Sequence, residues 1–148
     1  MKKIFAITIC LFSFLGVNAQ DQNPITWAAS YKSISATEGE IIITPKIEKG
    51  WHTYSQKVTA DGPVPTSFKY TESKQYTLVG KTEENNVHEE FDKAFDAKIF
   101  VVTDKSDFKQ KIKVSKPGLT VAIKIEFMCC NDMMCLPPKT IDLTVKTQ

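Results

Sequence analysis

Apolar and polar side chains alternate with a period of two residues along much of this chain. The clearest case is the segment 119–127, where polar or small side chains separate Leu119, Val121, Ile123, Ile125 and Phe127. Successive side chains of a β-strand point to opposite faces, so this period is typical of a strand with one buried face. The segment is therefore predicted to be a strand whose odd-numbered residues face the core.

Further strands are predicted where this period returns or where β-branched and aromatic residues cluster. These segments are 25–31, 41–47, 51–56, 76–79, 98–103, 108–114 and 141–145. Pro45 indicates an edge or a break in its strand. Turn signals separate the segments at 38–40, 48–50, 61–63 and 116–118. About seven to nine short strands with this spacing predict an all-β fold, an immunoglobulin-like antiparallel β-sandwich.

One stretch departs from the strand pattern. Residues 83–96 are acidic and carry Phe91 and Phe95 four positions apart. Side chains four apart lie on one face of a helix. We interpret the stretch as a loop with a short helix.

The first nineteen residues differ from the rest of the chain. Lys2 and Lys3 precede an apolar run at 4–15, and small residues at 16–19 end with Ala19. This order is typical of a secretory signal peptide. A membrane anchor is the alternative, but the run is shorter than the roughly 20 residues that a spanning helix needs. We predict a signal peptide at 1–19, a single domain at 20–148 and a periplasmic location.

Charge excludes some classes of function. The chain has 148 residues and a formal net charge of +2, and all 19 basic residues are lysines. Without arginine it lacks the bidentate forks that read guanine or clamp phosphate. A nearly neutral chain also lacks the basic surface that nucleic acid requires. We expect no nucleic-acid partner and no cofactor.

Three cysteines remain after the predicted cleavage: Cys129, Cys130 and Cys135. An odd number leaves at least one of them outside any internal pair. A bond between neighbours is disfavoured, because their Cα atoms are about 3.8 Å apart, below the usual disulfide range. The pairs Cys129–Cys135 and Cys130–Cys135 both stay open. If the strand alternation continues, Cys129 is buried and Cys130 is the accessible sulfur.

Three kinds of chemistry suit this segment. A disulfide that closes so short a loop constrains the unfolded chain little, so it is better suited to thiol–disulfide exchange than to stabilisation. The first alternative is a local staple in a structural or adhesion sandwich. The second is a Cu(I)-binding module, since copper favours soft sulfur ligands. Its ligands would be Cys129, Cys130, Met133, Met134 and Cys135.

A resemblance favours exchange. Residues 127–138 read Phe-Met-Cys-Cys-Asn-Asp-Met-Met-Cys-Leu-Pro-Pro. The segment follows a predicted signal peptide and a β-rich chain. It resembles the cysteine segment in the N-terminal periplasmic domains of the thiol:disulfide interchange protein DsbD family. Residues 49–54, Lys-Gly-Trp-His-Thr-Tyr, are a weaker match, and Gly80-Lys81 is a third. The similarity extends over most of residues 25–146.

The resemblance implies roles for individual residues. Cys130 and Cys135 would be the redox pair, cycling between dithiol and disulfide, with Cys129 as an additional thiol. Tyr54 matches an aromatic residue that packs near the pair. His52 stands where the family can place a second aromatic, and it would favour a thiolate if it lies close to one; the alternative is an ordinary surface histidine. The other residues expected to line the site are Trp51, Asn131, Asp132 and Pro137.

The resemblance also implies partners. In that family electrons come from a membrane-embedded domain through a thioredoxin-like domain, and they pass to periplasmic thioredoxin-fold proteins that serve disulfide isomerisation and cytochrome c maturation. DsbD carries a transmembrane core and a C-terminal thioredoxin domain, whereas this chain ends at Gln148. We therefore expect this protein to work in trans with a separate DsbD-like membrane electron donor. We expect a monomer. If the protein is an enzyme, it would be of the protein-disulfide reductase type.

An acidic and aromatic loop covers the cysteines in well-known members of the family. The corresponding stretch here is expected near residues 76–79, which contain no acidic residue. Residues 89–91, Glu-Glu-Phe, are the alternative lid.

Overall fold

Antiparallel strands make up the regular structure of the described part of the chain. The computed structural model describes residues 23–57 and 62–148, so the predicted signal peptide lies outside the described residues. Within that part the strands are β1 (Ile25–Ser33), β2 (Glu38–Ile47), β3 (His52–Tyr54), β4 (Ser67–Tyr70), β5 (Tyr76–Asn85), β6 (His88–Asp92), β7 (Ala97–Val102), β8 (Asp107–Val114), β9 (Thr120–Phe127), β10 (Cys129–Cys130) and β11 (Lys139–Lys146). The described residues contain no helix of the length and apolarity that crossing a membrane takes.

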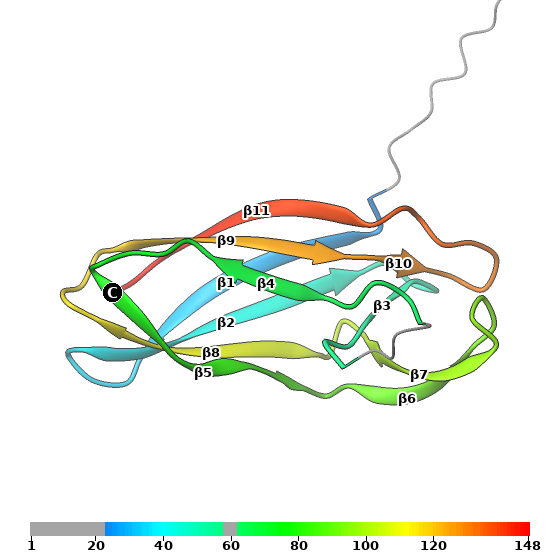
Figure 1. The fold of residues 1–148 in the computed structure, drawn as a ribbon, viewed down its shortest axis with the longest axis horizontal. Helices are drawn as coiled ribbons and strands as arrows, with labels where there is room; N and C mark the ends of the chain where they lie inside the picture. Colours follow the sequence, from blue (N-terminus) through cyan, green and yellow to red (C-terminus); the bar gives the residue numbers. More distant parts are fainter. Residues whose placement is uncertain (1–22, 58–61) are drawn as a thin grey trace, which may run out of the picture.

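The strands form three sheets, two of which face each other as a sandwich (Figure 1). One sheet has the order β1-β2-β8-β5 and the opposite one the order β11-β9-β4. The third sheet, β10-β3-β7-β6, lies at one end of the sandwich, at the right of Figure 1. This is the predicted all-β fold, an immunoglobulin-like antiparallel β-sandwich.

The period-two pattern determines which side chains enter the larger core. Along β9 the buried residues are Val121, Ile123, Ile125 and Phe127, as the alternation predicts. They meet buried side chains of β1, β2 and β8 in one cluster. Burial of so many aliphatic and aromatic side chains is the main stabilising contribution to this part of the molecule.

Two local predictions can be compared with the pairing of β2 and β5. Pro45 pairs only with Trp27 of β1, because pairing of β2 with β8 stops at Ile43. β2 runs on through Pro45 to Ile47, so the predicted break in the strand is not found. The alternative, an edge position, is confirmed, because no second strand pairs with β2 at Pro45. The predicted strand 76–79 continues to Asn85 after a register shift between Val79 and Glu83. Strand β4 was not predicted.

The predicted helix within residues 83–96 is wrong. Residues up to Asn85 pair with β8, and His88–Asp92 forms β6 beside β7. Asn86 and Asp96 have positive φ angles of 55° and 50°, a conformation that these two residue types tolerate well and that interrupts regular structure. The four-residue spacing of the two phenylalanines therefore reflects a strand followed by a turn.

Candidate functional site

A disulfide between Cys130 and Cys135 lies on the end sheet, and its S–S distance is 2.02 Å. Cys130 belongs to β10, where its Cα pairs with that of His52 on β3. The hydroxyl of Thr53 donates to the carbonyl of Met128 at 2.7 Å, at the point where β9 gives way to β10. The structure thus contains the bond that the family resemblance implied.

The turn that joins the two cysteines is held by hydrogen bonds of its own. Asn131 Oδ1 accepts from the backbone N–H groups of Met133 and Met134, both at 2.9 Å. The N–H of Asn131 donates to the carbonyl of Met134, and the N–H of Leu136 donates to that of Cys129. Asparagine favours such turns because its side chain satisfies backbone donors two and three residues ahead. The turn therefore fixes the position of Cys135.

The two bonded sulfurs differ in exposure. Cys130 is fully buried, whereas Cys135 is partly exposed. The expectation that Cys130 is the accessible sulfur is wrong. Cys130 does point to the opposite side from Cys129, but that side is covered by a smaller core cluster, which comprises Tyr54, Ile99, Val101 and Cys130. An attacking thiolate reaches Cys135 more easily.

Cys129 is a free thiol in the larger core. It is 5% exposed, and burial raises the pKa of its thiol, an effect that the charge of Lys139 partly offsets. A protonated thiol is a poor nucleophile and a poor metal ligand. Although Cys129 is next to Cys130 in sequence, it packs in a different cluster from the disulfide.

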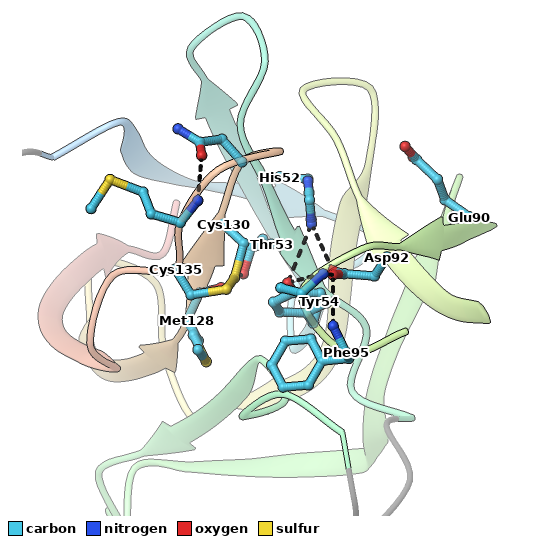
Figure 2. A network of polar contacts seen from close by, with 12 residues as sticks. His52, Thr53, Tyr54, Glu90, Asp92, Phe95, Met128, Cys130 and Cys135 are labelled. Carbon is cyan, nitrogen blue, oxygen red and sulfur yellow. Dashed lines mark hydrogen bonds and ion pairs between the residues drawn. A yellow bond between two sulfur atoms is a disulfide. The ribbon is translucent and has the colours of Figure 1, made fainter. Parts of the chain in front are cut away.

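A hydrogen-bonded group of three side chains adjoins the disulfide (Figure 2). The Tyr54 hydroxyl donates to Asp92 Oδ2 at 2.7 Å. His52 Nε2 lies 3.2 Å from the same carboxylate oxygen and 3.3 Å from the Tyr54 hydroxyl. His52 and Tyr54 alternate with Thr53 on β3, so their side chains share one face of the strand. Both candidates suggested by the resemblance therefore meet a third residue, Asp92.

Burial and hydrogen bonding act in opposite directions on Asp92. Its side chain is only 3% exposed, and burial alone would raise the pKa of the carboxyl. Hydrogen bonds from Tyr54, His52 and the N–H of Ala94 outweigh burial, so the pKa lies below its usual value. Burial and the adjacent carboxylate raise the pKa of Tyr54 well above its ordinary value. At neutral pH an ionised carboxylate thus accepts from a neutral phenol.

Asp92 also organises the turn after β6. Its Oδ1 accepts from the N–H of Ala94 at 2.8 Å and more weakly from that of Phe95. The Phe95 ring then packs edge-on against Tyr54, with ring centroids 6.0 Å apart. Phe95 and Met128 both pack against the smaller cluster that contains Cys130 (Figure 2). One carboxylate therefore joins β3 to the turn that carries Phe95.

Of the two stretches expected to cover the disulfide, residues 76–79 lie elsewhere in the molecule. Residues 76–79 pair with β8 in the main sandwich. Phe91 is 55% exposed and lines a small recess with Asn131 and Asp132 of the cysteine turn. Phe95 packs against the cluster that contains Cys130. The expectation of a cap at residues 76–79 is wrong, whereas a lid at residues 89–91 stays a prediction.

The remaining candidate site residues are not part of the hydrogen-bonded network of His52, Tyr54 and Asp92. Trp51 packs against the larger core. Asp132 is exposed and pairs with Lys93 at 3.4 Å, and Pro137 is exposed. The residues of the copper alternative are divided among the buried thiol of Cys129, the disulfide and the exposed pair Met133 and Met134. Within the described residues, no three His, Cys, Asp or Glu side chains group as a metal site.

Sequence reasoning missed Asp92, Phe95 and Thr53 as neighbours of the disulfide. Asp92 had a signal, since aspartate followed by a turn often accepts the N–H groups two and three residues later. No sequence pattern indicated Phe95 or Thr53, apart from the closeness of Phe95 to Asp92 and of Thr53 to His52 along the chain.

A protein-family model for "Thiol:disulfide interchange protein DsbD, N-terminal" matches residues 21–147. The chain belongs to this family. The match spans both the disulfide segment and β3, so the DsbD N-terminal family relationship covers the whole network described above. No curated protein matches the sequence significantly.

One solved structure supports the fold, and a second is more distantly similar. The N-terminal periplasmic domain of ScsB from Proteus mirabilis is similar with a TM-score of 0.53 and 18% identity, over 82% of this chain and 45% of that one. This chain therefore spans less than half the length of the ScsB chain. The N-terminal domain of DsbD from Neisseria meningitidis, in the reduced form, has a TM-score of 0.48 and 13% identity, over 80% and 83% of the two chains.

Proposed function

We propose that this protein is a periplasmic thiol–disulfide interchange domain that uses Cys130 and Cys135. The observation that carries the proposal is the unequal burial of the two bonded sulfurs, with Cys135 partly exposed on a fixed turn and Cys130 buried. Exchange needs one sulfur that a partner can reach and one that can act as leaving group and resolving thiol. Membership of the DsbD N-terminal family supports the same chemistry.

The proposed reduction has two steps. A partner thiolate attacks Cys135 Sγ, the bond to Cys130 breaks, and its electron pair stays on Cys130 Sγ, which takes up a proton. The partner's second thiolate then attacks the partner sulfur of the mixed disulfide and releases Cys135 as a thiolate. The partner ends as a disulfide, and this protein has gained two electrons.

Delivery to an acceptor runs the same steps in reverse. The Cys135 thiolate attacks the acceptor disulfide, and Cys130 then resolves the mixed disulfide. By analogy with the family, the donor is a separate DsbD-like membrane protein and the acceptors are periplasmic thioredoxin-fold proteins.

Cysteine substitutions test this assignment. Cys130→Ser is expected to trap a mixed disulfide with a thioredoxin-fold protein whose second cysteine is replaced by serine and whose first is activated as a mixed disulfide with an aromatic thiol. Cys135 displaces the aromatic thiolate, and neither protein then has a thiol in position to resolve the product. Cys135→Ser should trap far less, because Cys130 is buried. Mass spectrometry of the trapped peptides identifies the bonded residue.

Cys129→Ala is the matched control, and it should exchange as the wild type does, because its thiol belongs to the larger core. A wild-type disulfide that dithiothreitol reduces, but that no reduced thioredoxin-fold protein reduces, would show that it is a staple and that the relay is wrong.

A further inference from the structure

Two methionines stand exposed on the turn between the bonded cysteines. Met133 is 89% exposed and Met134 is 45% exposed. The turn itself is ordered by the two hydrogen bonds to Asn131 Oδ1, so these apolar side chains project from a fixed backbone. Single exposed apolar residues are common, but an adjacent pair presented by a well-bonded turn beside a reactive group points to a binding surface.

The geometry of a mixed disulfide determines what these side chains contact. The Cα atoms of two bonded cysteines are usually about 4.4–6.8 Å apart, so a partner bonded to Cys135 must bring its own backbone that close. Met134 precedes Cys135 directly, and Met133 precedes Met134. The partner surface around its reactive cysteine therefore packs against the exposed side of this turn.

A third exposed apolar side chain adjoins the same turn. Phe91, 55% exposed, lines a small recess together with Asn131 and Asp132. Lys93 and Asp132 pair across the recess at 3.4 Å, which connects the turn after β6 to the cysteine turn. Glu90 and Asp92 line the same recess, so its formal charge is negative on balance, and the apolar contact offered to a partner comes from Met133, Met134 and Phe91.

We propose that Met133 and Met134, together with Phe91, form a docking surface for a thioredoxin-fold protein. These side chains contact the apolar surface that surrounds the partner's reactive cysteine. The inference rests on the proposed function. Methionine is unbranched and polarizable, and surfaces rich in it adapt to partners of different shape. Such a surface suits a relay that must bind a donor and an acceptor in turn at one sulfur.

The test compares a protein reductant with a small one. The double variant Met133→Gln/Met134→Gln keeps side-chain length and removes apolar contact. With purified reduced thioredoxin as the probe, its second-order rate constant for reduction is expected to fall about tenfold or more, as for loss of buried apolar contact at an interface. With dithiothreitol, which needs no docking surface, the rate should stay within about twofold of wild type.

Ile34→Gln is the matched control. Ile34 is 60% exposed and lies between β1 and β2, a connection at the opposite end of the ribbon from the disulfide (Figure 1). It should reduce neither rate. If the double variant reacts with thioredoxin as fast as wild type does, or if both of its rates fall equally, the docking surface is wrong. If wild-type protein reacts with dithiothreitol but not with thioredoxin, the proposed function itself fails.

Discussion

The larger core and the disulfide end of this molecule are built in different ways. The buried residues of the larger core are aliphatic and aromatic side chains and one thiol, and they come from both sheets of the sandwich. The smaller cluster has four buried residues, and one of them, Tyr54, depends on a hydrogen bond to Asp92. Apolar area stabilises the first region, whereas polar contacts and a covalent bond organise the second.

The difference separates stability from reactivity. The disulfide joins β10 to the turn that follows it, and Cys130 belongs to a different cluster from the buried residues of the sandwich. A domain that cycles between dithiol and disulfide benefits from this division, because its fold need not depend on the bond it exchanges. Substitutions that weaken each region separately test this difference between the two regions.

The largest effect is expected in the sandwich. Phe108 is fully buried, and its ring lies 5.9 Å from that of Trp27 and 4.7 Å from that of Phe68. Phe108→Ala should lower the free energy of unfolding by about 3–5 kcal/mol, through lost burial and the cavity left behind. Urea unfolding measures it.

Phe100→Ala, at a residue that is 44% exposed, is the control and should change stability by about 0.5 kcal/mol or less. Similar losses for the two variants would contradict the assignment of the core.

A smaller, pH-dependent effect is expected at the disulfide end. Asp92→Asn replaces an acceptor oxygen with a donor beside Tyr54 and should cost about 1–3 kcal/mol at neutral pH. The folded-state pKa of Asp92 is lowered, so the carboxylate stabilises the fold above its unfolded pKa of about 3.9. That contribution is lost as the pH falls through the folded pKa.

The difference between wild type and variant should therefore shrink towards pH 3, as urea midpoints at several pH values would show. Asp132→Asn is the matched control, because the side chain of Asp132 is 84% exposed. A difference that stays constant between pH 7 and pH 3 would show that ionised Asp92 does not stabilise this end.

Sequence predicted the sandwich better than the site for a physical reason. The burial of Val121 to Phe127 on β9 follows from local alternation, and alternation also placed Cys129 and Cys130 on opposite faces. What covers Cys130 depends instead on Tyr54 and Phe95, which are remote from it in sequence. A local pattern gives the direction of a side chain, whereas its burial depends on whichever segment the fold brings over it.

The smallest change in stability, and the sharpest test of the cover, is expected at Phe95. This ring packs against Tyr54 over the cluster that contains Cys130, but it is itself only partly buried. Phe95→Ala should therefore cost about 1 kcal/mol, less than a core phenylalanine. We expect loss of the ring to widen access to the disulfide, so reduction by dithiothreitol should become several times faster, because exchange depends on access to sulfur.

Phe91→Ala gives the matched comparison four residues earlier. Phe91 is a phenylalanine of the same segment, but it is 55% exposed and does not belong to the cluster around Cys130. Its loss should leave the dithiothreitol rate unchanged, even though it contributes to the proposed docking surface, because a small dithiol does not dock. Equal rates for the two variants would mean that Phe95 packs at this end without limiting access to the disulfide.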